Sequence, residues 1–184
     1  MESYMNRISN TGIVPVVKIL EKEDAYPLAK ALLNGGIDVI EVTYRSEHAT
    51  SAIQTISEQL PDMLVGAGTV LSVEQAKEAV EAGAKFIITP GFNTKVVQWC
   101  LDHDVEVYPG VSTASEVEMA LSMGLTQLKF FPAESSGGAK KLKDLSAPYA
   151  NVHFMPTGGI NTKNMHDYLS LPNVEAIGGS FMLP

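Results

Sequence analysis

A short construction that occurs three times along the sequence limits the folds that this chain can adopt. At residues 36–41, 83–88 and 124–129, a glycine ends a helical stretch and a turn leads into an apolar strand. Repeated helix-to-strand units of this kind predict parallel strands joined by right-handed helical crossovers. The chain is therefore expected to be an α/β protein.

The same alternation extends over the whole sequence. The expected strands are residues 13–19, 39–43, 63–68, 86–89, 105–109, 127–131, 152–156 and 175–178. The expected helices are residues 23–34, 48–60, 72–82, 94–103, 113–124, 139–145 and 162–169. Short apolar strands are typical of parallel sheets that are covered on both faces. Eight such strands favour a closed (β/α)8 TIM barrel over an open doubly wound sheet.

The two ends of the sequence depart from eight complete units. Residues 1–10 are polar and are expected to form an N-terminal segment that caps one end of the barrel. The sequence stops at residues 181–184, where an eighth helix should begin. We expect either a barrel that lacks its last helix or a truncated version of a longer chain. A length of 184 residues suits one domain, so residues 1–184 are expected to form a single barrel domain.

Composition excludes several classes of protein. The net charge is −8 and the basic cluster of Lys140, Lys141 and Lys143 is typical of a solvated helix face, so no nucleic-acid partner is expected. No apolar run is long enough to span a bilayer and no signal peptide is recognisable, so we expect no membrane association and a cytoplasmic location.

The sequence offers little that could hold a metal. Cys100 is the single cysteine, which excludes a multi-cysteine zinc site, and its helical setting favours core packing. The four histidines lack ligand spacing, and no carboxylate cluster suggests magnesium. Neither a metal nor another cofactor is expected.

Lys129 lies inside one of the apolar strands. Alternation along residues 127–131 places Lys129 on the same face as Gln127 and Phe131, and this face should point into the barrel because Leu128 and Phe130 suit the helix-covered face. Lysine is rarely buried without a reason, and a desolvated amine is a candidate Schiff-base nucleophile. A structural lysine paired to a buried acid is an equally good interpretation of this strand alone.

A second strand sends a charge into the same interior. In residues 39–43 the apolar pair Ile40 and Val42 suits the outer face, so Glu41 points inward. Arg45 follows with the same parity at the mouth of the barrel. An unpaired buried carboxylate would be as costly as an unpaired buried ammonium, so Glu41 and Lys129 are expected to stabilise each other.

Small and hydroxylated residues mark three other strand ends. Residues 66–69 read Gly-Ala-Gly-Thr, whose glycines allow a ligand or another backbone to approach closely. Thr69 is either a ligand-binding hydroxyl or a helix cap. Glycine pairs occur at Thr157-Gly158-Gly159 and at Gly178-Gly179-Ser180, the seventh and eighth strand ends, where such barrels commonly bind phosphate.

Five segments together resemble the 2-keto-3-deoxy-6-phosphogluconate (KDPG) and 4-hydroxy-2-oxoglutarate (KHG) aldolase family. They are Glu-Val-Thr-Tyr-Arg at 41–45, Gly-Ala-Gly-Thr-Val-Leu at 66–71, Lys-Phe-Phe-Pro-Ala-Glu at 129–134, Pro-Thr-Gly-Gly-Ile at 156–160 and Ile-Gly-Gly-Ser at 177–180. The resemblance runs from about Gly12 to the last residue, and the order of the segments makes it highly specific. It implies a metal-independent class I aldolase of carbohydrate metabolism, with a (β/α)8 barrel and usually a homotrimer.

The resemblance also implies roles for individual residues. Lys129 would form the Schiff base and Glu41 would carry protons. Arg45 and Thr69 would hold the pyruvyl carboxylate. The substrate tail and its phosphate would bind at the following residues: Thr157, Gly158, Gly159, Gly179 and Ser180. The expected ligands are a phosphorylated 2-keto acid and pyruvate. Members of the family continue into a final helix, and the sequence departs from them there.

Three other functions remain open. The first is an aldolase for the phosphogalactonate analogue or chiefly for unphosphorylated 4-hydroxy-2-oxoglutarate. The second is a different phosphate-binding barrel, similar to a thiamin phosphate synthase, although the sequence offers no ligands for a pyrophosphate-bound metal. The third is a non-catalytic barrel that binds a sugar phosphate or only assembles with its own copies.

Overall fold

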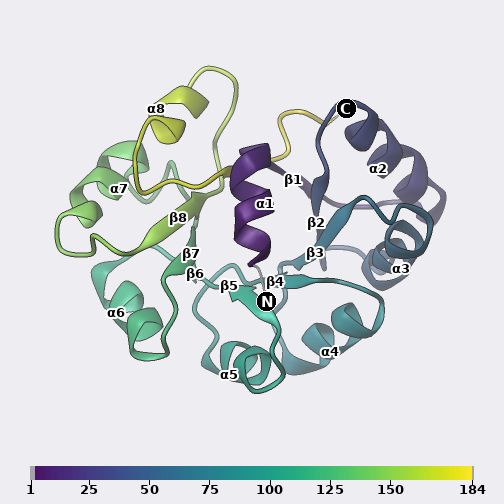
Figure 1. The fold of residues 1–184 in the computed structure, drawn as a ribbon, viewed down its shortest axis with the longest axis horizontal. Coiled ribbons are helices and arrows are strands. Elements are labelled where there is room, and N and C mark those ends of the chain that lie inside the picture. The colour runs from purple at the N-terminus through teal and green to yellow at the C-terminus, as the bar shows by residue number, and fades with distance from the viewer. Residues whose placement is uncertain (1–2, 184) are drawn as a thin grey trace.

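The computed structural model describes residues 3–183 and has an α/β fold built on a curled parallel sheet. The strands lie inside, and all the helices except the first surround them (Figure 1). The strands are β1 (Ile13–Val17), β2 (Val39–Thr43), β3 (Leu64–Gly68), β4 (Phe86–Ile88), β5 (Glu106–Tyr108), β6 (Gly110–Val111), β7 (Gln127–Phe130), β8 (His153–Pro156) and β9 (Ile177–Gly179). The helices are α1 (Tyr4–Thr11), α2 (Ala25–Asn34), α3 (Ala49–Gln59), α4 (Val73–Glu81), α5 (Thr94–Asp102), α6 (Ala114–Ser122), α7 (Gly138–Ser146) and α8 (Met165–Leu169).

Strand pairing is parallel throughout the described residues. A six-stranded sheet has the order β5-β4-β3-β2-β1-β9, and a three-stranded sheet has the order β6-β7-β8. A single parallel bridge between Thr157 and Gly178 lies where β8 and β9 end. The strand expected at 105–109 is shortened to β5, which pairs with β4, and the short strand β6 after Pro109, which pairs with β7, was not expected.

The element types expected from the sequence are confirmed, and most boundaries shift by one or two residues. The expected helix at 162–169 is shorter, since α8 begins only at Met165 and Asn164 occupies its N-cap position. The last strand is β9, two residues later than expected at its start, and Glu175 lies outside it. After β9 a turn closes with a hydrogen bond from Leu183 N to Ser180 O, and Pro184 lies outside the described residues.

The alternation of side chains in β2 and β7 determines the two faces of the sheet. Ile40 and Val42 are buried in a cluster with residues of the surrounding helices, and Leu128 and Phe130 are buried in a second such cluster. The opposite face of the strands therefore points inward, as the sequence predicts. Glu41 and Lys129 lie on this inward face and are themselves buried.

Helix α1 covers one end of the inward face. Its Met5 and Ile8 are fully buried with a third cluster of inward-facing strand residues, which includes Val39, Leu64 and Phe86. Figure 1 shows α1 across the middle of the ring of strands. The expected cap is thus confirmed for residues 4–11, while Met1 and Glu2 lie outside the described residues.

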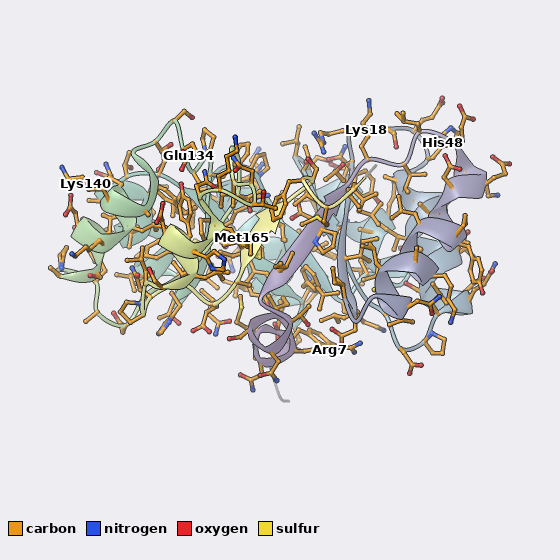
Figure 2. The ribbon with its side chains drawn as sticks, turned by 90° about the horizontal axis from the view of Figure 1, so that it is seen from above. Arg7, Lys18, His48, Glu134, Lys140 and Met165 are labelled. Atoms are coloured by element: carbon orange, nitrogen blue, oxygen red, sulfur yellow. The ribbon has the colours of Figure 1, made fainter. Side chains whose placement is uncertain are left out.

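The other end of the sheet carries the loops that follow the carboxyl ends of the strands. Figure 2 shows Arg7 of α1 at one edge of the molecule and Lys18, His48 and Glu134 toward the opposite edge. The last three residues follow β1, β2 and β7. Because the strands are parallel, all the residues that directly follow a strand lie toward this second edge, where α/β proteins place their sites.

Candidate active site

The site is organised around a buried ion pair. Lys129 Nζ lies 3.3 Å from Glu41 Oε1, with Lys129 only 4% exposed and Glu41 fully buried. The second oxygen, Glu41 Oε2, is buried and has no hydrogen-bond partner among the described residues. Lys129 Nζ also lies 5.2 Å from the centre of the Phe131 ring, a cation–π contact. The carboxylate therefore contacts the amine with one oxygen and keeps the other available to exchange a proton.

Arg45 lies at the mouth of the same interior. Its Nε donates to Thr43 Oγ1 at 3.1 Å, and Thr43 in turn donates to the carbonyl of Val17 at 2.8 Å. This chain of bonds fixes the start of the guanidinium group, while its remaining N–H groups can bind a carboxylate in a bidentate manner. Thr43 lies two residues after Glu41 and two before Arg45, so alternation also places it on the inward face, but the sequence does not indicate that it holds Arg45.

Thr69 is held in an unusual backbone conformation. Its φ is 53°, in the left-handed region that residues other than glycine rarely adopt. The N-cap of α4 is Ser72, whose side chain accepts a hydrogen bond from Gln75 N, so the interpretation of Thr69 as that cap is wrong. Thr69 lines the same cavity as Lys129. Strained residues of this kind cluster at functional sites.

The strand ends after β8 and β9 form the other side of the cavity. Gly158 and Gly159 have φ values of 104° and 79°, which glycine adopts without strain. Thr157 Oγ1 is buried without a hydrogen-bond partner among the described residues. A Cβ on Gly178 would lie 2.3 Å from this oxygen, so the absent side chain of Gly178 makes room for the Thr157 hydroxyl.

One cavity of about 270 Å³ joins these elements. It is lined by the eight expected site residues other than Glu41, namely Arg45, Thr69, Lys129, Thr157, Gly158, Gly159, Gly179 and Ser180, together with Val16, Pro90, Phe131 and Ile160. Glu41 is absent from this lining because it lies fully buried behind Lys129. Alternation predicts that Phe131 points inward, but the sequence does not mark Phe131, Val16 or Ile160 as lining residues, since by type they cannot be told from ordinary core residues.

The glycines of residues 66–68 do not leave space for a ligand. A Cβ on Gly66 would lie 2.0 Å from the Phe86 ring, and a Cβ on Gly68 would lie 1.9 Å from Glu41 Oε1. The expectation of a close ligand or backbone approach is therefore wrong at both positions. The side chains of Phe86 and Glu41 occupy the space instead.

A hydrogen-bonded pair supports the loop that follows β7. The Tyr168 hydroxyl donates to Glu134 Oε1, and burial together with this bond raises the pKa of Tyr168 well above its usual value. Ala133 N and Glu134 N donate to the carbonyls of Thr157 and Gly158, at 2.8 and 3.1 Å. Backbone hydrogen bonds therefore join the loop after the Lys129 strand to the Gly158–Gly159 turn. The sequence pattern does not indicate these bonds.

The remaining candidates have structural surroundings. Cys100 is fully buried in the core, and burial raises the pKa of its thiol to about 12, so the expectation of core packing is confirmed. Within residues 3–183, no group of three or more His, Cys, Asp or Glu side chains has an arrangement that could hold a metal ion. Over the same residues, none of the helices combines the length and the apolar character needed to cross a membrane.

A buried lysine beside a carboxylate, in a cavity at the carboxyl ends of parallel strands, defines a class of α/β protein equipped for lysine-dependent carbonyl chemistry. The profile of the KDPG and KHG aldolase family matches residues 4–184. The chain belongs to this family.

Individual relatives agree with this assignment. The chain is 47% identical to the 2-dehydro-3-deoxy-phosphogluconate aldolase of Treponema pallidum over 184 residues, which are 100% of this chain and 88% of that protein. It is 45% identical to the KHG/KDPG aldolase of Escherichia coli K12 over 178 residues, which are 96% of this chain and 84% of that protein.

A solved structure shares both the fold and the sequence. The KDPG aldolase of Legionella pneumophila, crystallised with pyruvate captured at low pH as a covalent carbinolamine intermediate, superimposes with a TM-score of 0.96. Its sequence is 42% identical, and the match covers 100% of this chain and 89% of that one.

Proposed function

We propose that this protein is a class I aldolase that cleaves 2-keto-3-deoxy-6-phosphogluconate to pyruvate and glyceraldehyde 3-phosphate. The observation that carries the proposal is the contact between Lys129 Nζ and Glu41 Oε1 behind a cavity of the size of a small ligand. The family assignment and the pyruvate adduct of the L. pneumophila relative support it.

The reaction begins with attack of the Lys129 amine on the C2 ketone. Before the attack, Lys129 gives one ammonium proton to Glu41, and after it a second amine proton moves to the former ketone oxygen, which gives the carbinolamine hydroxyl. Glu41 then donates its proton to this hydroxyl, so water leaves and the protonated imine remains. The free oxygen of Glu41 then accepts the proton of the C4 hydroxyl. The C3–C4 bond breaks, its electron pair moves to the imine nitrogen, and glyceraldehyde 3-phosphate leaves.

The second half of the reaction regenerates the lysine. Glu41 protonates C3 of the enamine, which restores the imine of pyruvate. Water then adds to C2, and collapse of the carbinolamine releases pyruvate and the free amine of Lys129. One carboxylate serves all the proton transfers in turn because it contacts the reacting amine directly.

The other lining residues bind the ends of the substrate. Arg45 pairs with the pyruvyl carboxylate, since its Nε is already anchored on Thr43 and its remaining donors are free for a bidentate contact. Thr69 lies in the same cavity and contributes its hydroxyl. The Thr157–Gly158–Gly159 turn, with Gly179 and Ser180, binds the phosphate through backbone N–H groups and the serine hydroxyl.

The wider organisation of the protein belongs to the same proposal. We infer that the two hydrogen-bonded sheets form one closed (β/α)8 barrel, with β5 and β6 as a single interrupted strand and the Thr157–Gly178 bridge at its closure. Residues 1–184 then constitute one aldolase domain. By the family resemblance the protein acts in the cytoplasm as a homotrimer.

A second activity on 4-hydroxy-2-oxoglutarate, which would yield pyruvate and glyoxylate, is favoured by one observation. Lys129 and Glu41, proposed for the chemical steps, and Arg45, proposed for the carboxylate, are distinct from the residues proposed for phosphate, so the chemical steps need no phosphate. The E. coli relative at 45% identity is a KHG/KDPG aldolase.

The direct test is a lyase assay coupled to pyruvate detection, with the phosphogluconate-derived substrate, its galactonate analogue and 4-hydroxy-2-oxoglutarate compared side by side. The proposal expects the highest kcat/KM with the phosphogluconate-derived substrate. A higher value with the galactonate analogue would assign the protein to that alternative. Release of pyruvate from none of the three would support the non-catalytic alternative.

A further inference from the structure

Gly68 of β3 lies against the carboxylate of Glu41. The register pairs Gly68 with Thr43, so Gly68 and Glu41 belong to neighbouring strands. A Cβ on Gly68 would lie 1.9 Å from Glu41 Oε1 and 2.5 Å from both Cγ and Cδ. Atoms cannot approach so closely, so the missing side chain of Gly68 is the space that the Glu41 carboxylate occupies.

The same oxygen makes the contact with the lysine. Oε1 is the atom that lies 3.3 Å from Lys129 Nζ, and Glu41 is fully buried. Gly66, two residues earlier on the same face of β3, also lacks a side chain, and the Phe86 ring fills the space there. The carboxylate therefore has the β3 backbone on one side and Lys129 on another. An added methyl group at Gly68 would displace the carboxylate and lengthen its contact with Lys129.

We propose that Gly68 is a positioning residue of the aldolase reaction, because the absence of its side chain places the Glu41 carboxylate against Lys129. The inference rests on the proposed function, in which Glu41 carries the protons. Gly68 does not line the cavity and therefore acts through Glu41. Its φ lies outside the left-handed region, so its backbone conformation is open to alanine and the consequence of Gly68→Ala is steric.

The first experiment compares two reactions of pyruvate with the intact protein. Exchange of the C3 protons in D2O, followed by NMR, requires proton transfer by Glu41, whereas borohydride trapping after long incubation requires only that Lys129 form the imine. We expect Gly68→Ala to slow the exchange by about 10- to 100-fold, the range for a misplaced catalytic group, and to retain end-point trapping per folded molecule.

The control is Gly91→Ala. A Cβ on Gly91 meets no atom within 4 Å and its φ is unrestricted, so this variant should exchange at the wild-type rate. Wild-type exchange in Gly68→Ala would overturn the proposal. The proposal would also be overturned if the exchange rate and the trapped fraction both fell in proportion to the folded fraction. That pattern would indicate a purely structural role for Gly68.

A second experiment measures the steric contact without using activity. Gln keeps the volume of Glu at position 41, whereas Ala removes it. Gly68→Ala should lower Tm by roughly 2 to 10 °C in the wild type and in Glu41→Gln, but not in Glu41→Ala. Should Gly68→Ala alone fail to fold, recovery of folding in Gly68→Ala with Glu41→Ala supports the proposal. Equal losses of Tm in all three backgrounds, or no recovery, would contradict it.

The two experiments separate this inference from the proposed function. A wild-type protein that neither exchanges the C3 protons nor forms a pyruvate adduct contradicts the proposed function, and the Tm comparison then decides the contact between positions 68 and 41 by itself.

Discussion

Lys129 and Glu41 are 88 positions apart in the sequence, and their charged atoms lie 3.3 Å apart inside the curled sheet. A buried lysine suggests either a structural ion pair or a nucleophile. The structure unites the two, because the partner of the amine is a carboxylate whose second oxygen remains without a partner among the described residues. The ion pair that makes burial tolerable is also the pair that can exchange a proton.

Removal of Lys129 alone should destabilise the fold. Lys129→Met leaves the fully buried Glu41 carboxylate without its cation, and such a loss typically costs about 3–5 kcal/mol of unfolding free energy. The double variant Lys129→Met with Glu41→Leu removes both charges and should recover most of this loss. Urea unfolding of the wild type and the variants measures it. Equal stabilities of the single and double variants would show that the pair is not energetically coupled.

Glu41→Gln should cut turnover by about two to four orders of magnitude, the usual range for the loss of a general acid–base group. Gln fills the same volume, so the position of Lys129 should be kept, although loss of the buried charge pair should lower the unfolding free energy. Steady-state release of pyruvate measures the effect, with circular dichroism as the control for folding. Unchanged turnover would assign the proton transfers to another group.

Ser180→Ala should discriminate between the two substrates. Ser180 lines the cavity and is one of the residues proposed to bind the phosphate, whereas Arg45 is proposed to bind the pyruvyl carboxylate. Loss of one hydrogen bond to a charged group costs about 1.5–3 kcal/mol, so KM for the phosphorylated substrate should rise by roughly 10- to 100-fold. Kinetics on 4-hydroxy-2-oxoglutarate should not change. An equal effect on both substrates would place the phosphate elsewhere.

Arg45→Lys should weaken binding of the pyruvyl carboxylate. Lysine keeps the charge but loses the planar fork that binds a carboxylate with two bonds and the Nε that is held by Thr43. We expect KM to rise about 10-fold, with a smaller change in kcat. Thr43→Val removes the hydroxyl that accepts the hydrogen bond from Arg45 Nε, and it should also raise KM. A KM that is unaltered in Arg45→Lys would exclude the bidentate contact.

Tyr168 should make stability sensitive to alkaline pH. Burial, and then its hydrogen bond to Glu134, raise the pKa of Tyr168, so the folded protein keeps the phenolic proton where the unfolded chain has lost it. This contribution is fully present below the unfolded pKa of about 10 and is lost as pH rises above it. Unfolding free energies at pH 8 to 11 should fall less steeply in Tyr168→Phe. If the unfolding free energies of the wild type and of Tyr168→Phe fell equally with pH, Tyr168 would not be the group responsible.

Much of the site could be predicted because a parallel sheet obeys simple geometry. Alternation along β2 and β7 places Glu41 and Lys129 on the inward face, and parallel pairing brings the residues after each strand to one edge. Arg45, Thr69, Gly158, Gly159 and Gly179 follow from the same rule, and all of them line one cavity with Lys129.

Features that depend on which side chain fills a space could not be predicted in this way. The sequence indicates that Gly66 and Gly68 allow a close approach, but only the structure identifies the Phe86 ring and the Glu41 carboxylate as the groups that approach. The bond between Tyr168 and Glu134 joins α8 to the loop after β7 and leaves no periodic trace in the sequence. Likewise, β5 pairs with β4 whereas β6, just after Pro109, pairs with β7, and this change of partner strand leaves no pattern in the local sequence.

The most direct test of the proposed chemistry is borohydride reduction of the protein in the presence of pyruvate, followed by mass spectrometry of its peptides. Attack by Lys129 predicts one reduced pyruvyl group per chain, on the peptide that contains Lys129, and none in Lys129→Met. The absence of an adduct, or an adduct only on exposed lysines such as Lys140, would contradict the Schiff-base mechanism.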